Sequence, residues 1–322
     1  MRLTGTALAV VVCGAALVAR GPHRADFARR GEPAQVFRTG VDLVNVGVTV
    51  TDKRGVLATA LTADDFEIYE DGKKQEIRYF AAGDRSETAP ALHLGLLLDV
   101  SGSMNDDIGF TKTAAIKFLN TLTDAVDITV LDFDTEVRAA RYSQAEFARL
   151  IERIRQQKAR GFTALYDAVG MYLHGAAEQD GRSIMLLYTD GGDTRSSLSL
   201  AELMDLLKAS NVTVYPIGAL DHQSASVRGQ QRMLLQRIAE VTGGQAFFPG
   251  SVKELDGVYE KVVAEIRAQY TLGYLSTNPK TDGAWRKVDV KIVRKDGKDL
   301  RTRSRRGYFA PFKRQGPSGS VR

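Results

Sequence analysis

Hydrophobic and polar positions alternate in two parts of the chain, one on each side of its middle. From residue 44 to residue 50 every second position is valine, with Asn, Gly and Thr between. The same period of two recurs at 270–274 and 288–292, and residues 300–309 are suited to form a returning strand. Asp71-Gly72, between the apolar-containing runs 66–69 and 75–80, is a hairpin signal. Both flanks therefore predict half-buried β-strands.

The middle of the chain has a different pattern. Stretches rich in apolar residues at 93–99, 127–133, 184–188 and 212–217 predict buried strands, and amphipathic stretches between them predict helices. Three of these helices are expected to open with capping boxes, in which a serine and a glutamate three positions later satisfy each other's backbone amides. The pairs are Ser143 and Glu146, Ser199 and Glu202, and Ser251 and Glu254.

The alternation of strands and helices predicts an α/β fold, with a mostly parallel sheet covered by helices on both faces. Each flank offers only three or four strands, which is marginal for independent stability. We therefore expect residues 36–85 and 270–310 to form one β-sandwich, into which a Rossmann-like α/β domain, residues 88–269, is inserted. The basic, Gly- and Ser-containing residues 311–322 are expected to be a disordered tail.

The N-terminus has the features of a secretory signal peptide over residues 1–21. A basic start precedes a mostly apolar run to Val18, and small residues follow. The run is shorter than the ~20 residues of a membrane span, although an uncleaved N-terminal anchor stays an alternative. We expect an exported protein, periplasmic or extracellular. Cys13, the only cysteine, lies in this run, so the mature chain would have neither thiol catalysis nor a cysteine-ligated metal.

Charge is unevenly distributed in this chain, whose net charge is +5. Residues 91–268 hold 18 basic and 23 acidic side chains, whereas residues 269–322 hold 14 basic and four acidic ones. The basic end lacks the interleaved aromatic residues of RNA-binding surfaces, and nucleic acid would conflict with export. We therefore expect a solvated basic face, no nucleic-acid partner, and membrane contact only through an N-terminal anchor.

Oxygen-bearing side chains follow the apolar runs in the middle of the chain. Asp99, Ser101 and Ser103 form a DxSxS sequence directly after the run 93–98. Thr163 stands at the start of a predicted helix, and Asp190 ends the run 184–188. Carboxylate and hydroxyl oxygens suit Mg²⁺ or Mn²⁺ rather than zinc or copper. The sequence therefore predicts a metal site where open α/β sheets bind ligands, outside the carboxyl ends of the strands.

These three pieces together resemble the metal-ion-dependent adhesion site of von Willebrand factor type A (VWA) domains. The resemblance assigns Mg²⁺, with Mn²⁺ or Ca²⁺ as alternatives, to Asp99, Ser101, Ser103, Thr163 and Asp190. It implies that an Asp or Glu carboxylate of a protein partner completes the coordination. Three nearby carboxylates, those of Asp106, Asp107 and Asp193, are interpreted as helix-start or rim charges and not as ligands.

The flanks carry a second resemblance. The segments 48–52, 65–72, 270–274 and 306–308 look like those of the bacterial VWFA-related Acidobacterial domain family. This similarity covers residues 36–311. It implies the same architecture, an α/β domain between two β flanks, and assigns no biological role.

Enzyme functions form the main alternative. The stretch from Asp132 to Thr135 resembles the DxD loop of haloacid-dehalogenase-type phosphatases, but Glu136 replaces their usual Thr or Val and the loop is not on the first strand. A Ser-His-Asp hydrolase would need a serine in a GxSxG elbow, which the chain lacks. We therefore predict a non-enzymatic, metal-dependent protein-binding module. A structural envelope scaffold without metal function and a metal-dependent hydrolase or phosphatase are the alternatives.

Overall fold

The computed structural model of the chain describes residues 43–83, 89–121, 125–294 and 299–312. Its strands form one five-stranded sheet and two four-stranded sheets. The expected signal segment, residues 1–21, and residues 313–322 of the expected tail lie outside the described residues. No helix in the described part of the chain has the length and apolar character that a membrane crossing needs.

The five-stranded sheet has the order β7-β6-β5-β8-β9. The central strand β5 pairs in parallel with β6 and β8, and β8 pairs in parallel with β9. Only the edge strand β7 is antiparallel, because it returns directly from β6. The predicted mostly parallel sheet is therefore confirmed. Its strands are β5 (Leu92–Asp99), β6 (Asp127–Phe133), β7 (Val137–Ser143), β8 (Arg182–Thr189) and β9 (Thr213–Gly218).

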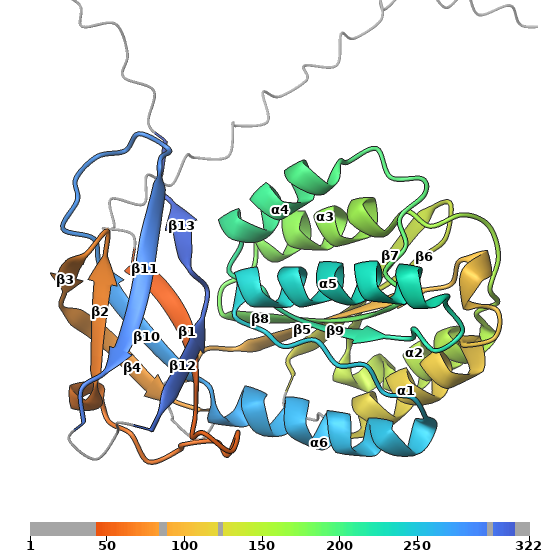
Figure 1. The fold of residues 1–322 in the computed structure, drawn as a ribbon, viewed down its shortest axis with the longest axis horizontal. Coiled ribbons are helices and arrows are strands. Elements are labelled where there is room, and N and C mark those ends of the chain that lie inside the picture. Colours follow the sequence, from red (N-terminus) through yellow and green to blue (C-terminus); the bar gives the residue numbers. More distant parts are fainter. Residues whose placement is uncertain (1–42, 84–88, 122–124, 295–298, 313–322) are drawn as a thin grey trace, which may run out of the picture. The chain divides into compact units, whose positions relative to one another are not determined.

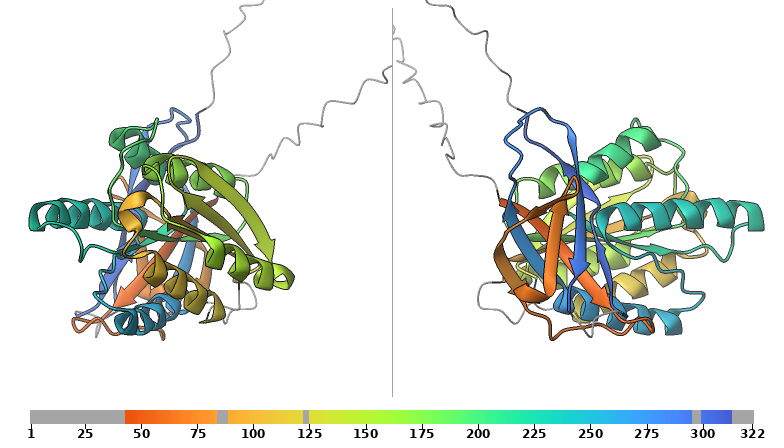
Figure 2. Two further views of the ribbon diagram at one scale, coloured as in Figure 1. Left: turned by 90° about the vertical axis from the view of Figure 1, so that its right-hand side faces the viewer. Right: turned by 60° about the vertical axis from the view of Figure 1, so that its left-hand side comes forward.

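Helices pack on both faces of this sheet (Figures 1 and 2). On β5, Leu94, Leu96 and Leu98 point to α1, α2 and α6, whereas Leu97 points to α3, α4 and α5. Burial of both faces explains why β5 is apolar almost throughout instead of alternating. The helices are α1 (Ile108–Thr121), α2 (Phe147–Gln156), α3 (Leu165–Ala176), α4 (Leu200–Ala209), α5 (Ala225–Thr242) and α6 (Val252–Ala268).

A glycine in the middle of β5 allows one of these helices to approach closely. A Cβ added to Gly95 would lie 2.3 Å from ring carbons of Tyr172 on α3. Tyr172 is buried there, and its hydroxyl donates a hydrogen bond to the carbonyl of Ile184 at 3.3 Å. The absent side chain at residue 95 thus makes room for an aromatic ring against the central strand.

The two four-stranded sheets have the orders β12-β1-β10-β4 and β13-β11-β2-β3. Each combines strands from both flanks, and their apolar faces share one core that includes Val46, Ile68, Tyr270 and Val290. The predicted fold class, a Rossmann-like domain inserted in a β-sandwich, is therefore confirmed. The strands are β1 (Leu43–Thr51), β2 (Phe66–Glu70), β3 (Lys73–Gln75), β4 (Ile77–Ala82), β10 (Tyr270–Leu275), β11 (Trp285–Ile292), β12 (Arg301–Ser304) and β13 (Gly307–Phe309), with a 3₁₀ turn, η1 (Ala63–Asp65), before β2.

Some expected elements differ from those observed. The strand expected at 75–80 breaks after Gln75, so that β3 and β4 lie in different sheets, and the strand expected at 300–309 divides in the same way into β12 and β13. Ser143 opens a 3₁₀ turn, η3 (Gln144–Glu146), before α2. At α6 the expected capping box is incomplete, because Glu254 accepts from the amide of Gly250 and not from that of Ser251. The exact domain boundaries stay a prediction.

Arg303 of β12 ties the sandwich to the α/β domain. Its Nε donates to the carbonyl of Gly243 at 3.0 Å, its Nη1 donates to Gln245 Oε1 at 2.7 Å, and it forms an ion pair with Glu265 of α6. Gly243 ends α5 in the left-handed conformation, with φ of 79°, and a Cβ there would lie 2.8 Å from backbone atoms of Ser304 and Arg305. The left-handed backbone conformation and the close approach of β12 both require glycine at this position.

Candidate metal centre

The DxSxS loop leaves the sheet at the carboxyl end of its central strand. β5 ends at Asp99, and a short 3₁₀ turn, η2 (Gly102–Met104), follows before α1 begins at Ile108. The DxSxS residues thus lie at the strand end and in the turn that precedes the long helix. The amide of Ser101 donates to Asp99 Oδ1 at 2.9 Å, and the hydroxyls of Ser101 and Ser103 lie 3.1 Å apart. The structure thus brings these three predicted residues together.

Asp190 reaches the same place from the neighbouring strand. β8 ends at Thr189, and because Leu98 pairs with Tyr188 in parallel register, Thr189 lies beside Asp99. The Thr189 hydroxyl donates to Asp99 Oδ2 at 2.6 Å and accepts from the amide of Gly191 at 3.0 Å. Asp190 Oδ1 accepts from the amide of Gly192 at 3.0 Å. A carboxylate thus lies at the carboxyl end of each of two adjacent strands, since Asp99 is the last residue of β5 and Asp190 directly follows β8.

Thr163 lies in the loop before α3, which begins at Leu165 with Ala164 as its cap. The loop before it is bonded to the DxSxS loop, since Gly102 donates to the carbonyl of Gly161 at 3.0 Å. Thr163 itself is buried and is bonded to the loop after Asp190: its amide donates to the Thr194 hydroxyl at 3.0 Å, and its carbonyl accepts from the amides of Thr194 and Arg195. The predicted residues thus come from three loops that are bonded to one another.

Asp99 is a carboxyl group without solvent exposure and without a basic partner among the described residues. Its hydrogen bonds come from the neutral groups of Ser101 and Thr189. Burial raises the pKa of Asp99 to about 7, with a smaller contribution from the nearby Asp190 carboxylate, although those hydrogen bonds oppose the shift. Two buried carboxylates without a basic side chain beside them would be stabilised in their charged form by a bound divalent ion.

The donor set fits a hard cation that keeps part of its water. Nowhere in the described part of the chain do three or more His, Cys, Asp or Glu side chains gather into a cluster that could hold a metal. A metal held here would therefore depend on the hydroxyls of Ser101, Ser103 and Thr163 in addition to Asp99 and Asp190. Oxygen ligands with few charges and retained waters are typical of Mg²⁺ sites.

Two of the three carboxylates interpreted as rim charges, Asp107 and Asp193, have other partners. Asp107 lies before α1, and its Oδ2 is 3.1 Å from Nδ1 of His222. The contact with this carboxylate raises the pKa of His222. Asp193 Oδ1 accepts from the amide of Tyr166, at 3.2 Å, and from the hydroxyl of Ser196, at 2.6 Å. Next to His222, the side-chain Nε2 of Gln223 donates to Asp190 Oδ2 at 3.0 Å.

The DxD sequence at the end of β6 lies in a different environment. Asp132 forms ion pairs with Arg138 and Arg153, and Asp134 pairs with Arg138 and Arg160. Burial alone would raise the pKa of Asp134, but the hydrogen bonds from Arg138, Glu136 and Arg160 together hold it below its usual value. Both carboxylates are thus engaged in a buried ionic cluster, which gives no support to a phosphatase nucleophile.

The three histidines among the described residues do not form a hydrolytic triad. His93 is buried on β5, where Nδ1 contacts Asp127 at 3.1 Å and Nε2 contacts the carbonyl of Asp180 at 3.1 Å. His174 is exposed on α3, and His222 pairs with Asp107. His23 lies outside the described residues.

Thr189 is the contact that sequence reasoning missed. Its hydroxyl links Asp99 to the turn at Gly191, which has a positive φ of 82°. Two signals were available, namely the polar residue at the end of an otherwise apolar run and the neighbouring position of two parallel strands. Neither indicates a side-chain hydrogen bond before the strand register is known.

Comparison with known proteins identifies a family. The family model described as von Willebrand factor type A domain matches residues 93–261. No curated protein matches the chain. Similar solved structures include the von Willebrand factor type A protein from Catenulispora acidiphila, with 15% identity, 76% of this chain and 74% of that chain covered, and a TM-score of 0.47.

Two further structures share this degree of similarity. The pilus adhesin SpaC from Lactobacillus rhamnosus GG has 12% identity, with 77% of this chain and 48% of that chain covered and a TM-score of 0.46. An aerotolerance-related membrane protein from Bacteroides fragilis has 12% identity, with 55% and 98% covered and a TM-score of 0.45. The family model alone spans more than half of the sequence. The chain therefore belongs to the von Willebrand factor type A domain family.

Proposed function

We propose that the chain is an exported protein-binding module whose binding depends on a divalent metal ion. Mg²⁺ would be held by Asp99, Ser101, Ser103, Thr163 and Asp190, with Mn²⁺ or Ca²⁺ as substitutes. The observation that carries the proposal is the pair Asp99 and Asp190, two buried carboxylates that have no basic partner among the described residues.

The bound ion would supply a positively charged, incompletely coordinated centre that attracts a carboxylate. The protein's own groups then have definite tasks. Thr189 and the Ser101 amide orient the Asp99 carboxylate from either side, and the Gly192 amide orients Asp190. Because the hydroxyl ligands are neutral, an Asp or Glu side chain of a partner protein would be the natural additional ligand.

Metal binding is tested directly by Mn²⁺ titration of the full chain, monitored by electron paramagnetic resonance, and by thermal unfolding after EDTA treatment and re-addition of Mg²⁺, Mn²⁺ or Ca²⁺. We expect one saturable Mn²⁺ site that Mg²⁺ displaces, and a rise in melting temperature. Asp99→Ala should lose both responses. The matched control is Asp205→Ala, which removes an exposed carboxylate on α4 and should keep both.

Absence of a saturable site in the wild type would contradict the metal function. The chain would then fit the alternative of a scaffold that has the VWA fold without metal chemistry. Where metal binds, partners are sought by affinity capture with and without EDTA from a periplasmic or surface extract. A partner retained only with Mg²⁺, and lost when its acidic residue is replaced, would establish the binding mode.

A further inference from the structure

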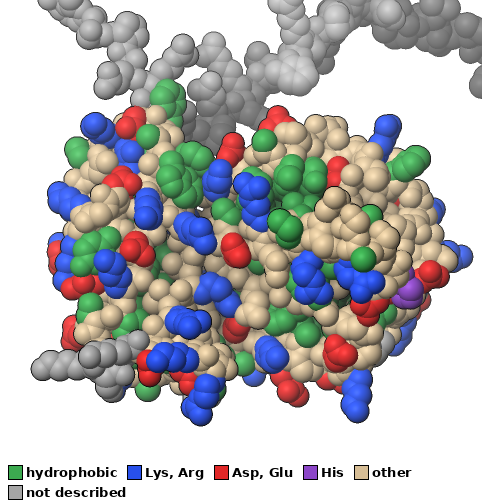
Figure 3. Space-filling view, viewed as in Figure 1, with side chains coloured by type: hydrophobic (Ala, Val, Ile, Leu, Met, Phe, Trp, Pro, Cys, Tyr) green, Lys and Arg blue, Asp and Glu red, His purple; other side chains and the backbone are tan. Residues whose placement is uncertain are grey.

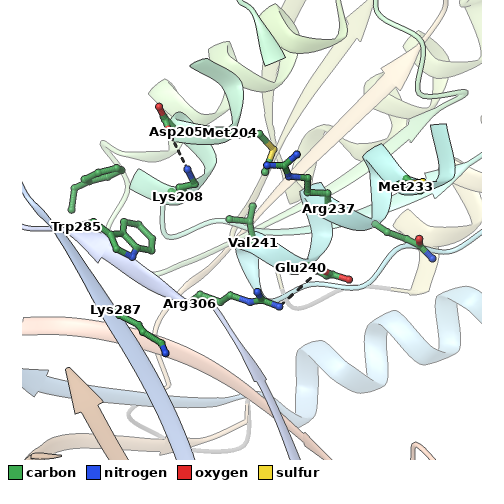
Figure 4. Close-up of a pocket in the computed structure, with 12 residues that line it drawn as sticks. Met204, Asp205, Lys208, Met233, Arg237, Glu240, Val241, Trp285, Lys287 and Arg306 are labelled. Atoms are coloured by element: carbon green, nitrogen blue, oxygen red, sulfur yellow. Dashed lines mark hydrogen bonds and ion pairs between the residues drawn. The ribbon is translucent and has the colours of Figure 1, made fainter. Parts of the chain in front are cut away.

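A second concave surface lies away from the candidate metal centre. A groove of about 1010 Å³ is lined by α4 and α5 of the α/β domain and by β11 and β13 of the sandwich (Figure 4). This volume is at the upper end of the range for ligand pockets and leaves room for several side chains of a peptide. Arg303 and Gly243 fix the junction between the two walls, so the groove is part of the fold.

The groove has an apolar floor. Met204 and Val241 line it from the helices, and Trp285 and Phe309 line it from the sandwich. The rings of Trp285 and Phe309 pack edge to face with centroids 5.1 Å apart, and Phe309 remains 39% exposed. Met233 on α5 adds an apolar side chain that is 71% exposed. Exposed apolar side chains with a polar border are typical of binding surfaces.

Basic side chains border this floor. Four basic and two acidic residues line the groove. Lys208 pairs with Asp205 at 2.8 Å and Arg306 approaches Glu240 at 4.0 Å, which uses both acidic groups. Arg237 and Lys287, from opposite walls, are exposed and have no ionic partner among the described residues. Figure 3 shows Lys and Arg side chains gathered along the middle of this face.

The charge of the groove disfavours the chain's own ends as occupants. Residues 313–322 contain three basic and no acidic side chains, and residues 1–42 contain six basic and three acidic ones. Both segments would bring positive charge to a positively charged surface. We therefore look for an occupant of complementary charge in another protein and not in these segments.

We propose that this groove is a second, metal-independent docking site for an extended acidic segment of a partner protein. Aromatic or aliphatic side chains of the segment pack on Trp285 and Phe309, and its carboxylates pair with Arg237 and Lys287. In an extended peptide, alternate side chains point to opposite sides, so alternating acidic and apolar residues would meet the floor and the rim together.

Trp285 provides a reporter, because it is the only tryptophan of the chain. The probe is an eight-residue peptide in which glutamate alternates with phenylalanine, titrated into the full chain in EDTA while tryptophan fluorescence is recorded. We expect a saturable change at low salt that weakens as salt is added. Two control peptides, lysine alternating with phenylalanine and glutamate alternating with alanine, should bind at least tenfold more weakly.

Substitutions in the groove test whether the peptide binds there. The double variant Arg237→Glu with Lys287→Glu should weaken the glutamate–phenylalanine peptide at least tenfold, because it places like charges on both walls. The double variant Lys253→Glu with Lys261→Glu reverses two exposed charges on α6 outside the groove; it is the matched control and should leave the affinity unchanged. Circular dichroism confirms that all variants fold, and Asp99→Ala should bind the peptide as the wild type does.

Three outcomes would overturn the proposal. One is the absence of a saturable change up to millimolar peptide. Another is equal binding of either control peptide, which would indicate nonspecific apolar or ionic attachment. The third is self-association of the chain that the double variant abolishes while the peptide fails to compete, which would assign the groove to a second copy. Because the titration is done in EDTA, loss of the metal proposal leaves this result unaffected.

Discussion

Two pairs of buried aspartates lie at the carboxyl ends of neighbouring strands, and their surroundings differ in one respect. Asp132 and Asp134, at the end of β6, face three arginines on β7, α2 and the loop before α3. Asp99 and Asp190, after β5 and β8, face amides and hydroxyls. The first pair is neutralised by the protein itself, whereas the second has no basic partner among the described residues.

This difference shows that the role of a carboxylate motif depends on whether basic side chains lie beside it in the folded protein. By sequence, both DxSxS and DxD follow apolar strands and both could bind a metal or act in catalysis. Once arginines take all four oxygens of a pair, it serves stability. The following substitutions test the comparison in order of decreasing expected effect.

The largest effect is expected when the neutralised pair is broken. Asp132→Ala leaves Arg138 and Arg153 without their shared carboxylate, and should reduce the free energy of unfolding by about 3 kcal/mol, measured by urea denaturation. The control Glu152→Ala removes an exposed partner of Arg155 and should cost less than about 0.5 kcal/mol. Equal small losses in both variants would mean that the buried cluster contributes no more than surface pairs.

Metal addition is the second test. At a Mg²⁺ concentration of 100 times the dissociation constant, the wild type should gain about 2.7 kcal/mol of stability, whereas Asp190→Ala should gain none. Melting curves with and without Mg²⁺ measure both. A full Mg²⁺ response in Asp190→Ala would place the ion elsewhere in the molecule.

The third test concerns a buried aspartate whose replacement should cost little stability. In EDTA, Asp99→Asn removes a desolvated charge near a second carboxylate while keeping an oxygen that accepts a hydrogen bond. Its free energy of unfolding should therefore stay within about 1 kcal/mol of the wild type or rise. Urea denaturation in EDTA measures this value. A loss as large as that of Asp132→Ala would show that both pairs are structural.

The smallest effect concerns acid stability. Because the pKa of Asp134 is lowered in the folded state, its ionisation stabilises the protein above the unfolded pKa near 4, and this contribution is lost as the pH falls through the lower folded value. Asp134→Asn should therefore flatten the dependence of stability on pH below about 4, by less than about 1 kcal/mol, in denaturation curves from pH 2 to 6. An unchanged slope in the variant would exclude Asp134 as a contributor.

Much of the fold was predictable because hydrophobic periodicity reports burial. The continuous apolar run of β5 indicated a strand covered on both faces, and the alternation at 44–50 and 270–274 indicated strands with one buried face. Local chemistry was equally readable: the Asp71-Gly72 hairpin has positive φ at both residues, as its sequence predicts. The order of Asp99, Thr163 and Asp190 along the chain likewise predicted the loops that meet.

Other features left weak traces in the sequence. The edge strand β7 buries only Tyr142, and α5 buries apolar residues only from Leu235 onward, so neither has a strong periodic pattern. The division of 75–80 and 300–309 between two sheets follows from how the sheets close on each other, which periodicity within a strand does not report.

The sequence by itself determined most of the elements, the family and the candidate oxygen ligands, because burial periodicity, turn chemistry and ligand type are local properties. Only the tertiary structure decided which aspartates find arginines, that Thr189 orients Asp99, and that Trp285 meets Met204 across a groove. These are contacts between residues far apart in the chain. Their existence depends on strand order and register, which bring distant side chains within hydrogen-bond or packing distance.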